Sequence, residues 1–178
     1  MSQIEADDAC VIAAYKQPNK VVVAVDKDAM GCPINVFNPN YPENGTVNCN
    51  KFGKLWLNDK GDVKGFGRLF FYYQVAYGDR VDGYLANSAA EMRWGEKSAY
   101  KVMTGCNNDK EALESIVKVY KELYPEPRII TGWQGGEFEV DWLYVASENW
   151  HLARMLRTIG ELESKVELKD VLSKMEIL

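Results

Sequence analysis

The sequence KVVVAVDKD at residues 20–28 contains five apolar residues in a row, followed by two aspartates separated by one lysine. An uninterrupted apolar run of this kind predicts a strand that is covered on both faces in a parallel sheet. Asp26 and Asp28 are two residues apart at the carboxyl end of this strand, so their side chains are expected on the same side. Because ligands of wound α/β sheets bind at this edge, the stretch predicts an α/β fold with an acidic ligand site.

The residues around this strand predict a helix before it and further short elements after it. Residues 5–17 have apolar residues at three- and four-residue spacing, which predicts a helix that ends at the PN pair at 18–19. CPINVFNPN at residues 32–40 favours a second short strand. Residues 40–54 are rich in turn formers and predict a surface loop. Helix followed by strand is typical of α/β winding.

The second half of the chain has a mostly helical pattern. Helices are predicted at residues 66–79, at 108–125 with Asn108 or Asp109 as N-cap, and at 138–157. Residues 78–105 alternate short helical pieces with glycines, and residues 161–178 predict a last helix or a frayed tail. Several aromatic and apolar side chains have helical spacing and are therefore expected in the core rather than as base-stacking platforms: those of residues 68–79, Trp142, Trp150, Met155 and Leu156.

The composition fits one domain of ordinary size, because 178 residues with 47% hydrophobic content can form a core. The four cysteines are far apart and His151 is the only histidine, which excludes a zinc site of standard spacing and leaves His151 without a predicted role. Reduced thiols are typical of a cytoplasmic protein. No apolar run of the sequence is long enough to cross a bilayer, so a soluble protein is expected.

The net charge of −5 argues at first against a nucleic acid partner. That argument loses its force if seven acids are metal ligands. Removing seven of the 26 acidic residues leaves 19 against 21 basic residues, and bound cations reverse the local sign of charge. Charge alone therefore does not decide the class of ligand.

Seven acidic residues occur in three short clusters, at the start of the first helix, after the apolar strand, and between two glycines: Glu5, Asp7 and Asp8; Asp26 and Asp28; Asp79 and Asp82. Crowded carboxylates repel one another and are costly to bury unless a cation holds them. Oxygen ligands without histidine or cysteine suit Mg²⁺. Two such ions about 4 Å apart would clamp the attacking water and the leaving oxygen of a phosphodiester, which is nuclease chemistry.

Each cluster also has an ordinary structural explanation. Acids at a helix N-terminus oppose the helix dipole, which applies to Glu5, Asp7 and Asp8. Asp26 and Asp28 could begin a turn, and Asp79 or Asp82 could cap a helix. The joint arrangement favours a site, because a solvated charged surface does not usually place its acids at the ends of its most apolar elements.

The chain resembles the 5′→3′ exonuclease and flap endonuclease family, particularly its short phage members. The resemblance is carried by three motifs in this order: EADD (Glu5, Asp7, Asp8), VDKD (Asp26, Asp28) and GDRVDGY (Asp79, Asp82). The resemblance covers residues 3–105 and, more loosely, the helices up to residue 157. It implies a two-metal site for Mg²⁺ or Mn²⁺, with Glu5, Asp7, Asp8 and Asp26 around one ion and Asp28, Asp79 and Asp82 around the other. It also implies a partial parallel sheet of PIN-like 5′ nuclease core in residues 1–77 and a helical DNA-binding region in residues 78–178.

In this family the segment after the third motif forms a helix-three-turn-helix that grips the duplex backbone and often holds K⁺. By position, residues 84–103 are expected to form this module, with Gly95 opening a helix toward a phosphate and Lys97, Ser98 and Lys101 at the DNA. The alanine-rich LANSAAEMR at residues 85–93 replaces the usual glycine-rich turn of the potassium site. An ordinary helical hairpin with solvated lysines is the alternative.

Family members have a first strand with another catalytic aspartate and a helical arch before the motif equivalent to EADD. We therefore expect this chain to act as the carboxyl-terminal part of a split phage nuclease in the infected bacterial cytoplasm, completed by a separate amino-terminal polypeptide on the open edge of the apolar strand. The expected activity is hydrolysis of DNA and RNA primers from 5′ ends. Two alternatives are a non-catalytic DNA-structure-binding or regulatory subunit and a PIN-like ribonuclease.

Overall fold

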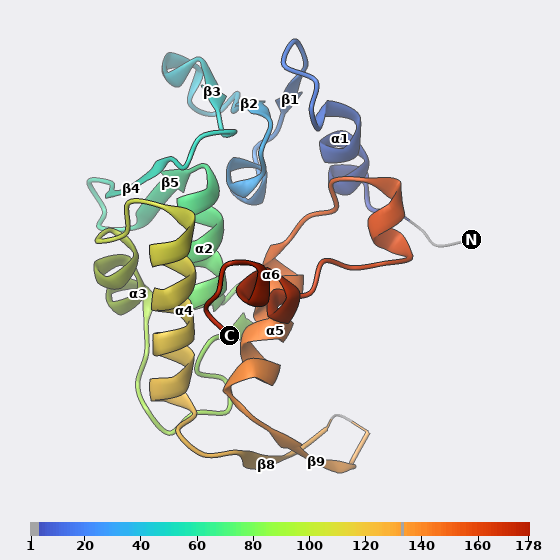
Figure 1. Cartoon of the computed structure of the whole chain (residues 1–178). Helices are drawn as coiled ribbons and strands as arrows, with labels where there is room; N and C mark the ends of the chain where they lie inside the picture. Colours follow the sequence, from blue (N-terminus) through green and yellow to red (C-terminus); the bar gives the residue numbers. More distant parts are fainter. Residues whose placement is uncertain (1–3, 133) are drawn as a thin grey trace. The chain divides into compact units, whose positions relative to one another are not determined.

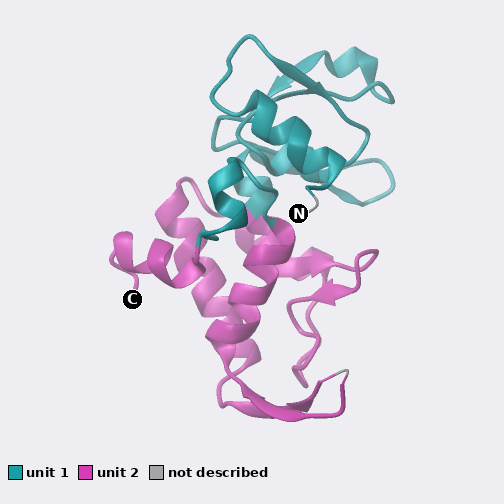
Figure 2. Cartoon of the chain, turned by 90° about the vertical axis from the view of Figure 1, so that its right-hand side faces the viewer, with its two compact units in different colours: residues 1–71, 154–166 teal, residues 72–153, 167–178 magenta. Residues whose placement is uncertain are grey.

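The computed structural model describes residues 4–132 and 134–178, which form six α-helices and four small sheets (Figure 1). The chain divides into two compact units (Figure 2). Unit 1 consists of Met1–Phe71 and Arg154–Val166, and unit 2 consists of Tyr72–Ala153 and Glu167–Leu178. None of the described helices combines the length and the apolar character needed to span a bilayer.

Unit 1 contains a three-stranded sheet in the order β1-β2-β3, preceded by helix α1. The elements are α1 (Ala6–Ala14), β1 (Val21–Val23), β2 (Asn35–Phe37) and β3 (Thr46–Asn48). β1 pairs in parallel with β2, and β2 pairs antiparallel with β3. The predicted α/β class, first helix and second strand are confirmed. The sheet is mixed, because part of the predicted surface loop forms β3, whose Val47 packs against the core.

The prediction that the apolar strand is covered on both faces is wrong. Val22 and Ala24 pack against the core of unit 1, whereas Val21, Val23 and Val25 are 45%, 68% and 58% exposed. The physical reason is the position of β1 at an edge of a small sheet, where only one face meets a helix and a loop of the described chain.

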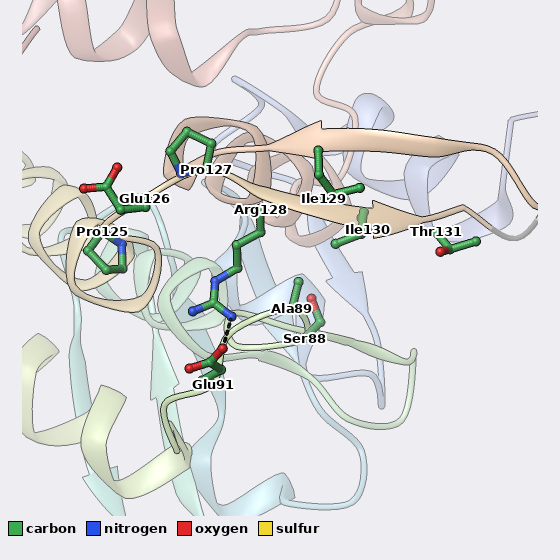
Figure 3. Close-up of a pocket in the computed structure, with 10 residues that line it drawn as sticks. All are labelled: Ser88, Ala89, Glu91, Pro125, Glu126, Pro127, Arg128, Ile129, Ile130 and Thr131. Atoms are coloured by element: carbon green, nitrogen blue, oxygen red, sulfur yellow. Dashed lines mark ion pairs between the residues drawn. The ribbon is translucent and has the colours of Figure 1, made fainter.

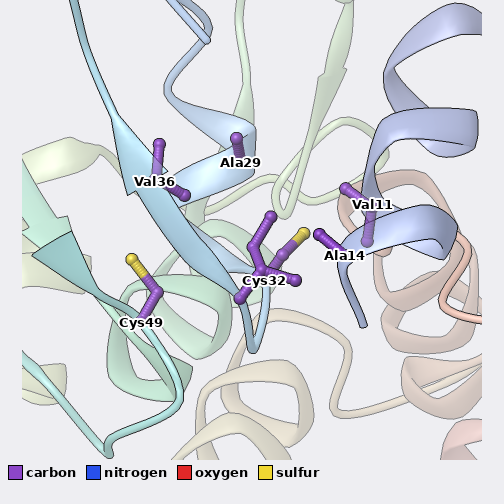
Figure 4. Packing of buried hydrophobic residues seen from close by; sticks show 7 residues of the cluster. Val11, Ala14, Ala29, Cys32, Val36 and Cys49 are labelled. Atoms are coloured by element: carbon purple, nitrogen blue, oxygen red, sulfur yellow. The ribbon is translucent and has the colours of Figure 1, made fainter. Parts of the chain in front are cut away.

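The core of unit 1 lies between α1, β2 and the short helical turn η1 (Asp28–Gly31) (Figure 4). Figure 4 shows α1 and β2 facing one another across this cluster. Its buried members are Val11, Ala14, Ala29, Cys32, Ile34, Val36 and Cys49. Met155 from the returning segment Arg154–Val166 packs against the same cluster, so the two parts of unit 1 share one core.

A β-hairpin follows the sheet of unit 1, with β4 (Lys54–Leu57) paired antiparallel to β5 (Val63–Phe66). Its turn begins at Asn58, whose side-chain oxygen accepts hydrogen bonds from the N–H groups of Lys60 and Asp62 at 3.0 and 2.8 Å. Gly61 has a φ of 81°, the left-handed conformation that favours glycine in such a turn. The hairpin is thus fixed by local turn chemistry, a feature that the sequence analysis did not identify.

Unit 2 is built mainly from α4 and α5, which pack against each other. Its elements are α2 (Arg68–Tyr77, whose first residues belong to unit 1), β6 (Gly78–Asp79), β7 (Tyr84–Leu85), α3 (Glu96–Met103), α4 (Asp109–Leu123), β8 (Arg128–Thr131), β9 (Glu137–Val140), α5 (Trp142–Ala153) and α6 (Leu168–Lys174). The predicted N-cap is confirmed, because the side chain of Asn108 accepts a 3.0 Å hydrogen bond from the N–H of Glu111. α6 docks through the fully buried Leu168 and Leu172.

Two predicted helical stretches of the second half differ from the structure. Residues 138–157 form β9 and then α5, because Asp141 caps the helix by accepting a 2.7 Å hydrogen bond from the N–H of Tyr144. α5 ends at Ala153, so Met155 and Leu156 do not belong to its buried face. Within residues 84–103, α3 is the one helix, since Tyr84 and Leu85 pair in β7.

Candidate functional site

Asp26 and Asp28 follow β1, which ends three residues before Asp26, at Val23. The N–H of Asp28 donates a 3.0 Å hydrogen bond to Oδ1 of Asp26, which forms a small turn. Asp26 is exposed, and Asp28 is half-buried at the first position of η1. The ordinary turn explanation therefore applies, and it also holds the two carboxylates at the carboxyl edge of a strand that is paired in parallel.

Glu5, Asp7 and Asp8 begin α1. Glu5 occupies the N-cap position without a side-chain capping hydrogen bond, and Asp7 and Asp8 lie in the first turn, where they oppose the helix dipole. Asp8 has a further partner, because its Oδ1 accepts a 2.8 Å hydrogen bond from the N–H of Leu156. Asp8 therefore connects the first motif to the returning segment of unit 1.

Asp79 and Asp82 belong to unit 2, where they flank the turn of the hairpin β6–β7. Asp79 is only 4% exposed, and its Oδ1 accepts a 2.7 Å hydrogen bond from the N–H of Val81. Gly78 has a φ of 93°, and a Cβ there would lie 2.4 Å from the carbonyl oxygen of Tyr84, so the close approach of β7 requires glycine. Asp79 is thus held rigidly in a turn, while Asp82 is exposed.

Asp79 also contributes to the environment of a buried phenol. Burial raises the pKa of Tyr73, and the nearby carboxylates of Glu96 and Asp79 raise it further. Tyr73 consequently stays protonated beside these acids and can donate a hydrogen bond to a carboxylate. Neither Asp79 nor Asp82 caps a helix, which removes that alternative explanation for the pair.

Most of the predicted acids are not neutralised by a basic side chain. Within residues 4–132 and 134–178, no ion pair with lysine, arginine or histidine involves five of the seven: Glu5, Asp7, Asp8, Asp26 and Asp82. All-oxygen donors of this type suit Mg²⁺ or Mn²⁺. Among the same residues, no group of three or more histidine, cysteine, aspartate or glutamate side chains could hold a metal ion. The metal site is accordingly a proposal from donor chemistry.

The residues expected to contact DNA lie at the start of α3. Gly95 is the N-cap of this helix and has a φ of −150°. A Cβ at this position would meet no atom within 4 Å, so the backbone does not require glycine there. Lys97, Ser98 and Lys101 are exposed on α3. In the part of the chain that the structure describes, neither lysine forms an ion pair.

Two half-buried arginines, Arg154 and Arg157, hold the returning segment of unit 1. Arg154 forms a 2.9 Å ion pair with Glu161, and the two side chains are only 9% and 13% exposed. Burial lowers the pKa of Arg157, and the neighbouring Arg154 lowers it further. The N–H of Arg157 also donates to Glu161. The helix predicted at residues 138–157 includes both arginines and does not indicate their role in fixing the segment that bonds Asp8.

A hollow of about 770 Å³ in unit 2 is lined in part by β8 (Figure 3). Figure 3 shows Arg128 reaching down to Glu91, and this ion pair measures 3.2 Å. None of the seven predicted acids lines this hollow.

A second cavity lies within unit 1 beside the hairpin β4–β5, and its lining includes Lys27, Lys54 and Trp56. These residues are not among the predicted site residues, although KLW and VKGF on either side of the NDKG turn are a recognisable hairpin pattern.

Comparison of the chain with family models, curated proteins and solved structures gives no match.

Proposed function

We propose that this chain is a metal-dependent 5′→3′ exonuclease and flap endonuclease that hydrolyses phosphodiester bonds of DNA and of RNA primers. The observation that supports this most is the pair Asp26 and Asp28, joined by a 3.0 Å hydrogen bond at the carboxyl end of the parallel-paired strand β1. That edge is where ligands of α/β folds bind. The lack of a basic partner for Asp26 among the described residues favours a cation as its counter-charge.

In this proposal the ligands of the Mg²⁺ or Mn²⁺ ions are carboxylates of the three motifs: Glu5, Asp7, Asp8, Asp26 and Asp28 in unit 1, and Asp79 and Asp82 in unit 2. Such ions supply charge stabilisation and activation of water. The chain itself contributes orientation. The turn at Asp26, the Leu156 N–H at Asp8 and the Val81 N–H at Asp79 each hold one carboxylate oxygen in place.

The proposed DNA-binding region is α3, the one helix within residues 84–103. Gly95 opens the helix toward a phosphate, and Lys97, Ser98 and Lys101 add backbone contacts without sequence readout. The parallel pairing of β1 with β2 supports a PIN-like 5′ nuclease core in unit 1. The K⁺ site of the family is the weakest element of the resemblance, since residues 85–93 lack its glycine-rich turn.

A separate polypeptide that adds a strand to β1 is the proposed partner. β1 is an edge strand, and its exposed face carries Val21 and Val23. An apolar edge of this kind is suited to strand addition. Native mass measurement of the complex purified from infected cells tests this: a heterodimer is expected, and a monodisperse, metal-active monomer would contradict it.

The activity is tested with labelled 5′-flap DNA, blunt duplex and single-stranded RNA, each with Mg²⁺ and with EDTA, with and without the product of the neighbouring reading frame. The proposal expects Mg²⁺-dependent release of 5′ products from the flap and the duplex. DNA binding without cleavage in the presence of the partner would identify a regulatory subunit, and preference for single-stranded RNA would identify a ribonuclease. Asp59→Asn, an exposed acid in the hairpin turn, is the control variant.

A further inference from the structure

Unit 1 contains a cavity of about 680 Å³ beside the hairpin β4–β5, a volume in the usual range for small-ligand sites. Its walls come from the hairpin, from the loop between β2 and β3, and from the residues after β1. None of the seven acids assigned above lines it, so it is distinct from the proposed metal site. Lys27 does line it and lies in the chain between Asp26 and Asp28.

The cavity is cationic although the chain is acidic. Its lining includes Lys27, Lys54 and Lys64 and, among the described residues, no aspartate or glutamate, whereas the whole chain has 26 acidic and 21 basic residues. Lys64 has one acidic neighbour, Asp62, at 3.9 Å; both side chains are about half exposed, so this pair neutralises little. The two hairpin lysines of this lining, Lys54 and Lys64, favour an anionic ligand.

Two aromatic side chains in the lining are unusually exposed, Tyr41 at 51% and Trp56 at 39%. Trp56 is opposite Lys64 in the hairpin, so the two side chains lie on the same face. Nζ of Lys54 lies 5.6 Å from the centroid of the Trp56 ring, and Phe66 supports the ring edge-on at 6.5 Å. An indole ring held in this way can stack on a nucleobase, and the lysines beside it can bind the phosphate of the same nucleotide.

Side-chain amides complete the polar lining. The structure shows no hydrogen-bond partner for the side chains of Asn40 and Asn44 within residues 4–132 and 134–178, whereas Asn58 is used in its own turn. An amide offers both a donor and an acceptor, which suits the edge of a base. A base within a duplex has its faces and its pairing edge occupied, so this lining suits an unpaired nucleotide.

We infer that this cavity binds an unpaired nucleotide of single-stranded DNA, with the base on Trp56 and the phosphates at Lys54 and Lys64. The binding requires no metal and goes beyond the proposed hydrolysis; only the choice of DNA rather than RNA rests on the proposed function.

The test is fluorescence anisotropy of labelled oligothymidylate in EDTA, with the whole chain. Trp56→Leu is expected to weaken binding about tenfold, and Trp56→Phe to restore most of it, because base stacking on one aromatic ring has about this effect. The double variant Lys54→Ala and Lys64→Ala is expected to reduce the slope of log affinity against log salt concentration by about 1.4. Lys60→Ala, an exposed lysine of the same hairpin outside the lining, is the matched control and should leave binding unchanged.

Unchanged affinity of a folded Trp56→Leu protein would overturn the inference, as would equally tight binding of blunt duplex. Thymidine monophosphate that binds as tightly as the oligonucleotide would identify a free nucleotide as the ligand and overturn the assignment to a strand. Adding Mg²⁺ to the same samples separates the two proposals. Oligonucleotide binding without any cleavage contradicts only the nuclease function, and cleavage with Trp56-independent binding contradicts only the cavity assignment.

Discussion

The carboxylate of Asp8 accepts a 2.8 Å hydrogen bond from the backbone N–H of Leu156, which lies 148 residues further along the chain. This contact joins the first acidic motif to the segment Arg154–Val166, which returns to unit 1 after the helices of unit 2. Asp8 therefore has a structural role that its position in the first turn of α1 does not indicate. A functional test of Asp8 must separate the charge of its side chain from its ability to accept this bond.

Asp8→Asn and Asp8→Ala separate these two properties. The asparagine keeps an oxygen that can accept from Leu156, so its free energy of unfolding should stay close to that of the wild type. The alanine should lose about 1–2 kcal/mol, because the Leu156 N–H loses its partner. If Asp8 is a metal ligand, both variants should lose activity. Urea unfolding and a flap-cleavage assay measure the two effects, and an active, stable Asp8→Asn protein would remove Asp8 from the ligand set.

Asp28→Asn and Asp79→Asn should each lower the cleavage rate more than about 100-fold and leave DNA affinity unchanged. Asparagine has nearly the same shape and keeps an oxygen, so the turn at Asp79 and Val81 should survive the change. Cleavage of a 5′-flap substrate in Mg²⁺ and anisotropy in EDTA give the two readouts. Normal turnover of both variants would remove Asp28 and Asp79 from the proposed metal ligands.

The sequence predicted the elements whose evidence is local. Asn108 could be identified as an N-cap because capping depends on residues within one turn, and the strand before Asp26 follows from a continuous apolar run. The exposed face of β1 could not be predicted, since coverage of Val21 and Val23 depends on which distant elements pack there. The Leu156 N–H at Asp8 is equally non-local, because a backbone donor has no sequence pattern. The lysine-lined cavity depends on the alternation of side chains in a short hairpin, which was visible in the sequence.

Replacing Lys97 and Lys101 together with alanine should weaken DNA binding similarly for all sequences, because phosphate contacts carry no sequence information. Both lysines are exposed on α3 four residues apart, so they lie on the same face. The slope of log affinity against log salt for duplex DNA should fall by about 1.8. The matched control replaces Lys110 and Lys118 of α4, which are also exposed. An equal loss in the control would indicate a general charge effect.

The free energy of unfolding should fall as the pH rises above 9. Burial raises the pKa of Cys32 to about 12 and that of Cys49 to about 11, from 9.0 for a solvated thiol. The unfolded chain therefore loses these protons first, and the stability that is complete below pH 9 is lost between pH 9 and about 11–12. Each thiol should contribute a slope of about 1 kcal/mol per pH unit. Urea unfolding under reducing conditions measures the slope, which Cys49→Ala should reduce and exposed Cys10→Ala should not.

Tyr120 is the residue of unit 2 whose polar group should matter most for stability. Its hydroxyl donates a 2.7 Å hydrogen bond to the carbonyl oxygen of Val75 in α2 and accepts a 2.8 Å bond from the side-chain amide of Asn149 in α5. Burial raises the pKa of Tyr120 well above its usual value, so the phenol is protonated at any physiological pH. One hydroxyl thus links three helices of the unit.

Tyr120→Phe should lower the free energy of unfolding by about 2–4 kcal/mol, because it leaves both buried partners without a hydrogen bond while the ring still fills its space. Tyr144→Phe, which removes an exposed hydroxyl from α5, should change stability by less than about 0.5 kcal/mol. In the double variant Tyr120→Phe with Asn149→Leu, the combined loss should be smaller than the sum of the single losses, since one shared bond is removed by either change. Strictly additive losses would show that Tyr120 and Asn149 do not interact in solution.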